Sequence, residues 1–193
     1  MHNAIAFILE LDKLKGVTRK TRPIGLDRFE NSAEHSWHIA LFAHALSVYA
    51  PAGCDINRVI RMLLVHDIGE IDAGDVLVYA EGDPQVRKAE ELAGVRRVCA
   101  LLPPARSQPL IALWEEFDAG ETPEARFANA LDRAMPALLN LHNKGQSWVE
   151  HGITYERVVT RIGPPIEAGC PELWAYLDNR LSEAKAAGWF GMG

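Results

Sequence analysis

The chain contains few cysteines, and they stand apart from one another. Its 193 residues include three, Cys54, Cys99 and Cys170, which form no Cys-x-x-Cys pair. An odd number of widely spaced cysteines provides neither a disulfide framework nor a cysteine-based zinc site. This pattern is typical of a reducing compartment, and we expect a cytoplasmic protein.

Long hydrophobic runs are also missing. No stretch approaches the roughly 18 consecutive apolar residues that a membrane-spanning helix requires. The segment 1–12 is partly apolar, but it lacks a basic leader and contains Glu10 and Asp12, unlike a signal peptide. The sequence therefore predicts an unprocessed chain with no membrane partner.

An excess of positive charge is absent as well. Lys and Arg number 20 against 26 Asp and Glu, which gives a formal net charge of -6. Binding to a nucleic acid polymer needs Lys and Arg clustered over a broad face, so we expect no such partner. A small phosphorylated ligand needs only one local basic patch. The length and the 48% hydrophobic content are those of one globular domain over residues 1–193.

No convincing run alternates apolar and polar residues, which argues against strands. Helical spacing and capping signals recur instead, so we expect an all-α fold, a compact single-domain bundle of about six to eight helices. Helices are expected over about 4–15, 32–50, 56–65, 84–102, 110–117, 123–138 and 171–187, with an amphipathic region that starts at Trp148 and ends before Gly163-Pro164-Pro165.

The stretch from Arg61 to Glu70 is unusual because an apolar helix ends in His66, Asp67 and Glu70. Burying such groups beside a core is costly unless something pairs with them. A divalent cation would satisfy His66 and Asp67 together, since both are good metal ligands. Glu70 returns to the same flank three and four residues later. The alternative is a helix end where His66 caps carbonyls and the acids face water.

A capping box over 31–34 predicts the start of the helix that carries His35 and His38. These two lie on one face, so sequence spacing does not say which points inward. A helix histidine is more often structural than a ligand, but a place in the first turn, beside acids and after a basic loop, favours His35. The expected apolar face of this helix comprises Trp37, Leu41, Ala45 and Val48.

A second anomaly is Asp132, which lies among apolar residues of a predicted helix. Pro136 lacks the N–H that would bond to the carbonyl of Asp132, so we expect the helix to kink or loosen there. Irregular backbone at an acid indicates a functional site. The alternative is that Asp132 pairs with Arg133 or faces solvent.

The segment 16–29 contains Pro23 and Gly25 and is predicted to be a loop. It is either a solvated basic loop or a clamp for phosphate or another anion. The segment has a single acid, Asp27. Its basic residues, together with Lys15 directly before the segment, are Lys15, Arg19, Lys20, Arg22 and Arg28.

The order of His35, His66-Asp67 and Asp132 along the chain resembles the H…HD…D signature of the HD-domain metal-dependent phosphohydrolases. The stretches Glu-Asn-Ser-Ala-Glu-His35-Ser-Trp-His, Leu-Leu-Val-His66-Asp67-Ile-Gly-Glu70-Ile-Asp-Ala-Gly-Asp75 and Ala-Leu-Asp132-Arg are similar to the branch that includes the bacterial 5′-deoxynucleotidases. The resemblance covers nearly the whole chain, from about residue 7 to residue 189.

This resemblance implies an HD-type fold, a homodimer, and hydrolysis of nucleoside 5′-monophosphates with release of phosphate. It implies that Glu70 and Asp75 serve the attacking water and the nucleotide. It places phosphate binding in the basic loop, with Arg19 as the best candidate and Lys20 and Arg22 behind it. In the family a tryptophan directly follows the phosphate-binding arginine, whereas Lys20 follows Arg19 here. The implied metal ligands are His35, His66, Asp67 and Asp132.

Two imidazoles and two carboxylates with open positions suit one divalent ion. Such a mixed set favours six-coordinate Mn²⁺, Co²⁺, Fe²⁺ or Mg²⁺ over a closed tetrahedral zinc site. Two other functions stay open. One is a nucleotide-binding or regulatory module with an idle metal site, although such a site usually loses Glu70 or a ligand first. The other is a di-iron oxygenase, but its second ligand pair has no match in the spacing of His38, His44, His142 and His151.

Overall fold

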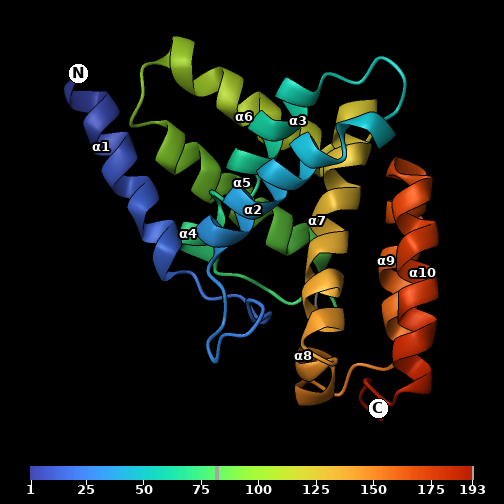
Figure 1. Cartoon of the computed structure of the whole chain (residues 1–193). Helices are drawn as coiled ribbons and strands as arrows, with labels where there is room; N and C mark the ends of the chain where they lie inside the picture. Colours follow the sequence, from blue (N-terminus) through green and yellow to red (C-terminus); the bar gives the residue numbers. More distant parts are fainter. Residues whose placement is uncertain (81–82, 193) are drawn as a thin grey trace.

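The computed structural model describes residues 1–80 and 83–192, and within them it contains helices and no strand (Figure 1). The prediction of an all-α fold is confirmed. Apart from the short α4 and α8, eight helices of ten or more residues occupy the described ranges. The elements are α1 (His2–Leu11), η1 (Asp12–Gly16), α2 (Ser32–Ala45), η2 (Ser47–Tyr49), α3 (Ile56–Val65), α4 (Glu70–Ala73), α5 (Pro84–Cys99), α6 (Pro104–Ala119), α7 (Pro123–His142), α8 (Gln146–Glu150), α9 (Tyr155–Gly169) and α10 (Pro171–Ala186).

The 20-residue helix α7 is the central element of the fold. It packs against α2, α3, α6, α9 and α10, and Figure 1 shows it running down the middle of the view with α9 and α10 beside it. Ala128, Leu131 and Ala134 on this helix are fully buried. Small residues between larger ones let neighbouring helices approach closely, so α7 holds α2 and α3 in fixed positions around its middle.

Local sequence signals set the starts of several helices. Asn31 and Glu34 form the predicted capping box of α2. The Asp55 side chain accepts hydrogen bonds from the N–H groups of Asn57 and Arg58 at the start of α3, and Thr122 accepts one from Ala125 at the start of α7. At the first helix only the predicted start differs, because α1 begins at His2 rather than at about residue 4, and η1 then follows it directly.

The expected inward face of α2 was also wrong. Trp37, Leu41 and Val48 are 61%, 51% and 81% exposed. The buried face instead carries His35 and Ile39, with small side chains beside them: Ser32, Ser36, Ala40 and Ala43. This mostly small face lets α2 lie close to α3 and α7, while Trp37 and Leu41 point outward.

Prolines interrupt fewer helices than the sequence suggested. The helix α9 continues through Pro164 and Pro165 to Gly169, and α6 begins at Pro104 rather than at residue 110 and contains Pro109. Close packing against α10 keeps α9 helical at its prolines. Gly163 lets the ring of Trp174 on α10 approach the backbone there, since an added Cβ would lie 2.9 Å from that ring. The helix α7 likewise continues across Pro136 to His142.

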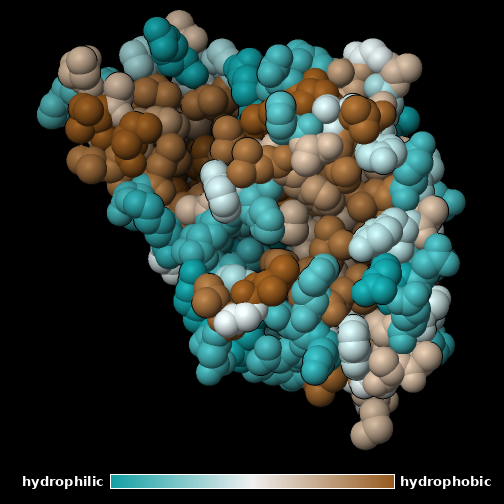
Figure 2. Space-filling model, viewed as in Figure 1, coloured by the Kyte–Doolittle hydropathy of each residue, from teal (hydrophilic) through white to brown (hydrophobic). Residues whose placement is uncertain are grey.

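Apolar residues are exposed on the surface, and Figure 2 shows many of them around a hollow near α1. On α1 itself, Ile5, Ile8 and Leu9 are exposed. A second copy of the chain could cover this surface, and the homodimer stays a prediction. In the described part of the chain, every helix is too short or too polar to traverse a lipid bilayer.

Two glycines bring α5 against the segment that follows α3. A Cβ at Gly94 would lie 2.7 Å from the carbonyl oxygen of Gly69, and a Cβ at Gly69 would overlap the backbone of Glu91. Real Cβ atoms do not approach backbone so closely. Because neither glycine has a side chain, the two backbones can touch, and this contact fixes the path of the chain between Asp67 and Glu70.

We expect Gly69→Ala to lower the free energy of unfolding by about 1–3 kcal/mol, because an added methyl group forces the backbone of α5 away. Urea unfolding followed by circular dichroism measures this change. Gly16→Ala is the matched control, since a Cβ there meets no atom within 4 Å. Equal stability of the two variants would contradict the close contact.

Candidate metal and phosphate site

Three separated segments bring two imidazoles and two carboxylates together. His35 comes from α2, His66 and Asp67 from the turn that follows α3, and Asp132 from the middle of α7. His35 Nε2 lies 3.0 Å from Asp132 Oδ1, and His66 Nε2 lies 2.9 Å from Asp67 Oδ1 and 3.6 Å from Asp132 Oδ1. Ligand atoms of His35, His66 and Asp132 all lie within 4.8 Å of one another, a spacing that suits one metal ion. Of the three histidines on α2, His35 is the fully buried one.

The orientation of His66 makes it ready to bind a cation. Its Nδ1 donates a hydrogen bond to the carbonyl oxygen of Leu63 at 2.9 Å, so in the neutral ring Nε2 carries the lone pair. Nε2 is buried, has no hydrogen-bond partner, and faces the carboxylates of Asp67 and Asp132. Trp114 on α6 donates to the carbonyl oxygen of His66 at 2.8 Å and holds this turn in place. The donor set fits a divalent metal, because neutral imidazole and carboxylate are both ligands of such ions.

The ionisation of these groups reflects the same arrangement. Burial opposes charge on His66, but Asp67 and Asp132 raise its pKa to about 10. Burial and the charge of Arg19 lower the pKa of His35 to about 4. Burial likewise opposes charge on Asp132, but the hydrogen bond with His35 and the nearby imidazole of His66 hold its pKa well below the usual range. The cluster thus favours a cation near His66 Nε2, where a proton and a metal ion compete.

Glu70 and Asp75 lie at the same cavity. Glu70 is the first residue of α4, and its Oε2 accepts a hydrogen bond from the hydroxyl of Ser32 at 2.5 Å. Burial, with the charge of Asp67, raises the pKa of Glu70 to about 9. Burial also raises the pKa of Asp75, against the opposing charge of Arg19. Both predicted acids therefore line the cavity with the ligand cluster, and the charges of Asp67 and Arg19 act on each of them.

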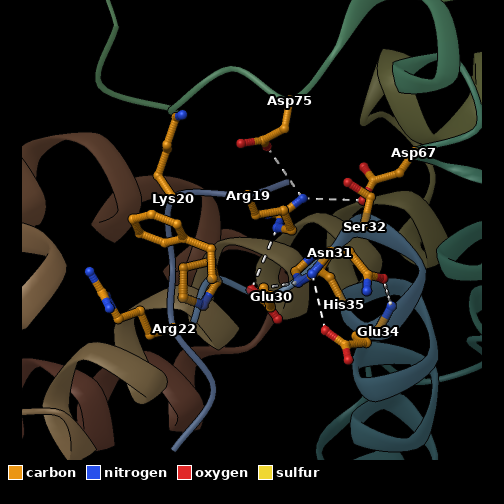
Figure 3. Close-up of polar contacts among 12 residues, drawn as sticks. Arg19, Lys20, Arg22, Glu30, Asn31, Ser32, Glu34, His35, Asp67 and Asp75 are labelled. Carbon is orange, nitrogen blue, oxygen red and sulfur yellow. Dashed lines mark hydrogen bonds and ion pairs between the residues drawn. The ribbon is translucent and has the colours of Figure 1, made fainter. Parts of the chain in front are cut away.

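Main-chain pairing brings Arg19 into this environment. An isolated antiparallel bridge joins Thr18 to Asn31, and the N–H of Arg19 donates to the carbonyl of Glu30 at 2.9 Å. The Arg19 side chain is only 12% exposed and lies 3.2 Å from Asp67 Oδ2 and 3.5 Å from Asp75 Oδ1. Figure 3 shows it pointing between these acids and Glu30. Their charges outweigh burial and raise the pKa of Arg19, which keeps its positive charge.

The other two basic candidates lie differently. Lys20 is exposed and lines the cavity. Arg22 points away from Arg19 in Figure 3 and pairs with Asp27 at 2.7 Å and Glu150 at 3.1 Å. Arg22 does not line the cavity. The structure thus groups Arg19 with the acids, puts Lys20 at the cavity wall, and leaves Arg22 outside.

The cavity has a volume of about 290 Å³, near the lower end of typical small-molecule sites. Its lining contains both charged and largely apolar residues. The charged ones include Arg19, His66, Asp67, Glu70, Asp75 and Asp132, and the others include Leu77, Tyr79, Phe117, Trp148 and Ile162. A ligand with an anionic group and a less polar ring system matches both kinds of residue.

Sequence reasoning missed Ser32, Glu30 and the bond made by Trp114. Ser32 could have been found, because it precedes His35 by three residues and so shares its helix face. A buried tryptophan usually finds a partner for its N–H, but the sequence does not say which one. Glu30 is 3% exposed and lies 3.8 Å from His35 Nδ1, a contact that depends on the pairing between residues 17–21 and 30–32.

Comparison with known proteins gives both a family and structural neighbours. Residues 11–174 match the sequence profile of a family described as HD domain. A crystal structure of a predicted metal-dependent phosphohydrolase from Magnetospirillum magnetotacticum MS-1 is 43% identical, with a TM-score of 0.93, covering 98% of this chain and 94% of that one. A conserved hypothetical protein from Pyrococcus furiosus, 19% identical with a TM-score of 0.59, covers 94% of this chain and 99% of that one and shows the fold alone.

Curated relatives are more distant. Human 5′-deoxynucleotidase HDDC2 is 27% identical over 108 residues, which are 56% of this chain and 52% of the human protein. The bovine protein of that name is 26% identical over 132 residues, 68% of this chain and 63% of the relative. The chain thus spans about half the length of the human relative that it matches.

We expect Mn²⁺ to raise the melting temperature, because an ion that binds only the folded state stabilises it. At about 100 times Kd the gain is about 2.7 kcal/mol, or several degrees at about 2–4 °C per kcal/mol. Differential scanning fluorimetry measures the shift. Asp132→Asn should lose it, whereas Asp12→Asn, at an exposed acid paired with Lys15, should keep it. The same shift in Asp132→Asn would exclude Asp132 as a ligand.

Proposed function

The chain belongs to the HD-domain family, and from that premise we propose that it is a metal-dependent phosphohydrolase that releases phosphate from nucleoside 5′-monophosphates, deoxynucleotides foremost. The observation that carries the proposal is the meeting of two imidazoles and two carboxylates beside the buried Arg19, which lines one cavity together with His66, Asp67 and Asp132. His35 completes the set through Asp132, 3.0 Å away. The names of the Magnetospirillum and human relatives support the reaction and the substrate class respectively.

In this proposal the two imidazoles and two carboxylates hold one divalent ion, Mn²⁺, Co²⁺, Fe²⁺ or Mg²⁺. When bound, such an ion polarises a phosphoryl oxygen and lowers the pKa of a coordinated water. His35 is suited to this task because its lowered pKa keeps the ring neutral near pH 7. His66 presents Nε2 because its Nδ1–H donates a hydrogen bond to the carbonyl oxygen of Leu63.

Arg19 binds the substrate phosphate. Its guanidinium forms ion pairs with Asp67 and Asp75, and a phosphate that enters the cavity competes with these carboxylates for its N–H groups. Lys20, exposed at the cavity wall, adds a second positive charge for the incoming anion. The positive charge of Arg19 offsets the negative charge that gathers on the phosphoryl oxygens in the transition state.

Glu70 orients the attacking water. Burial and the charge of Asp67 raise the pKa of Glu70, and a divalent ion at the cluster would offset that charge, so that the carboxylate can accept the proton of the water. The hydroxyl of Ser32 donates to one oxygen of this carboxylate and fixes its direction, which leaves the other oxygen for the water. Asp75 faces the nucleotide from the same wall. The apolar and aromatic residues of the cavity lining, which include Leu77, Tyr79 and Trp148, receive the nucleoside.

We expect inorganic phosphate to appear when the protein is incubated with a panel of ribo- and deoxynucleoside 5′-monophosphates and Mn²⁺ or Co²⁺. Chelation with EDTA should abolish the release. Asp67→Ala should lower kcat/KM by more than about 100-fold, because even groups that only support a metal ligand are worth up to about that factor. Asp12→Ala should match the wild type. Tight nucleotide binding without turnover would instead identify a binding or regulatory module.

Among the basic residues, we expect Arg19→Gln to lower kcat/KM by about 100-fold, the usual cost of losing one group that stabilises transition-state charge. Arg19→Lys should recover part of the loss, because it restores the charge but not the planar donor array. Steady-state kinetics on the best nucleotide measures both. Arg180→Gln, at an exposed arginine paired with Glu183, is the control. A larger loss in Arg22→Gln than in Arg19→Gln would contradict this prediction and assign phosphate binding to Arg22.

A further inference from the structure

Three buried polar atoms without a hydrogen-bond partner meet beside the ligand cluster. They are Glu30 Oε1, His35 Nδ1 and Arg19 Nε. Glu30 Oε1 lies 3.8 Å from His35 Nδ1 and 3.5 Å from Arg19 Nε. Figure 3 shows Glu30 between the two. Buried polar groups in folded proteins are normally hydrogen-bonded, so three such atoms facing one another form an incomplete network with a function to explain.

Their chemistry is complementary. Arg19 Nε always carries a proton and donates, and the Glu30 oxygen accepts. His35 Nδ1 donates or accepts according to the tautomer of the ring. A small approach of the side chains, or a water between them, would satisfy all three atoms through the one carboxylate.

The backbone of Glu30 is held on both sides. Its N–H donates to the carbonyl of Thr21 at 2.9 Å, and its carbonyl accepts from the N–H of Arg19 at 2.9 Å. The next residue, Asn31, is the N-cap of α2. The side chain of Glu30 therefore projects from a fixed point toward His35, five residues further along the chain, and toward Arg19 on the paired segment.

His35 lies between two carboxylates with one proton to share. Its Nε2 faces Asp132 at 3.0 Å and its Nδ1 faces Glu30. A proton on Nε2 prevents that nitrogen from binding a metal and turns the lone pair of Nδ1 toward the Glu30 oxygen. A proton on Nδ1 is accepted by Glu30 and frees Nε2 for the metal. The position of Glu30 thus decides which tautomer is stabilised when a cation is present.

We propose that Glu30 is a positioning residue that accepts a hydrogen bond from Nδ1–H of His35, so that Nε2 becomes the metal ligand. The same carboxylate holds Arg19 toward the phosphate. The inference rests on the proposed function, because it assigns Glu30 a role toward the metal and the phosphate of that site. The single carboxylate of Glu30 thus orients both the imidazole of His35 and the guanidinium of Arg19. A change at Glu30 therefore weakens metal binding and phosphate binding together.

The test compares wild type, Glu30→Gln and Glu34→Gln. Glu34 lies in the same segment, caps α2 and pairs with Arg28, so its substitution perturbs the helix start without touching His35 or Arg19. Nitrogen-15 NMR of the protein loaded with diamagnetic Zn²⁺ reports the His35 ring proton. We expect a downfield, slowly exchanging Nδ1 proton in wild type and Glu34→Gln. In Glu30→Gln the signal should move upfield and exchange faster, because a neutral amide is a weaker acceptor.

Calorimetric titration completes the test. Glu30→Gln should bind Zn²⁺ and Mn²⁺ about 10- to 100-fold more weakly, and inorganic phosphate should bind more weakly to its metal-loaded form. Loss of melting temperature alone, as expected for Glu34→Gln, is the mark of a merely structural role. An unchanged His35 proton signal and unchanged metal affinity in Glu30→Gln would overturn the inference, even if nucleotides are hydrolysed. Weaker metal binding in Glu30→Gln would uphold it, even if no nucleotide is a substrate.

Discussion

Negative charge buried inside the fold is the constraint on which the rest of the site depends. Glu30, Asp67, Asp75 and Asp132 lie near one another with little access to water. Removing carboxylates from water costs several kcal/mol each unless cations or donors accompany them. Arg19 alone pairs with three of them, and a divalent ion supplies the rest of the compensation in our proposal. Metal binding and phosphate binding are therefore linked, because a phosphate that occupies Arg19 leaves Asp67 in need of another cation.

The scaffold meets this constraint with rigid elements and fixed main chain. His35 and Asp132 project from packed helices, whereas His66 and Asp67 lie in a turn that needs additional support. Trp114 supplies it from α6 through the carbonyl of His66, and the contact between Gly69 and α5 fixes the next residues. The turn that carries His66 and Asp67 is thus held by contacts with α5 and α6, which keeps its geometry defined before any ligand arrives.

The sequence predicted the local features and the grouping of the site, but not the way the helices face one another. Caps at Asn31 and Thr122 were predictable because their hydrogen bonds lie within four residues. The order of the imidazoles and acids indicated a common site through its resemblance to a family. The outward position of Trp37 and the passage of α9 through its prolines depend on which helix lies alongside, as the contact of Gly163 with Trp174 illustrates. Glu30 escaped notice because its place depends on a pairing of two loops that no periodicity reveals.

The bridge between Thr18 and Asn31 also separates two kinds of residue within one loop. Those on its inner side, Arg19 and Glu30, are tied by backbone hydrogen bonds, whereas 23–28 form the exposed or half-buried tip beyond it. Because the ends of the tip are already clamped, extra length there carries little entropic penalty. The tip is therefore the natural place to insert a tag or to graft new sequence, and the natural place for relatives to diverge. The site on the other side of the Thr18–Asn31 bridge stays intact when the tip changes.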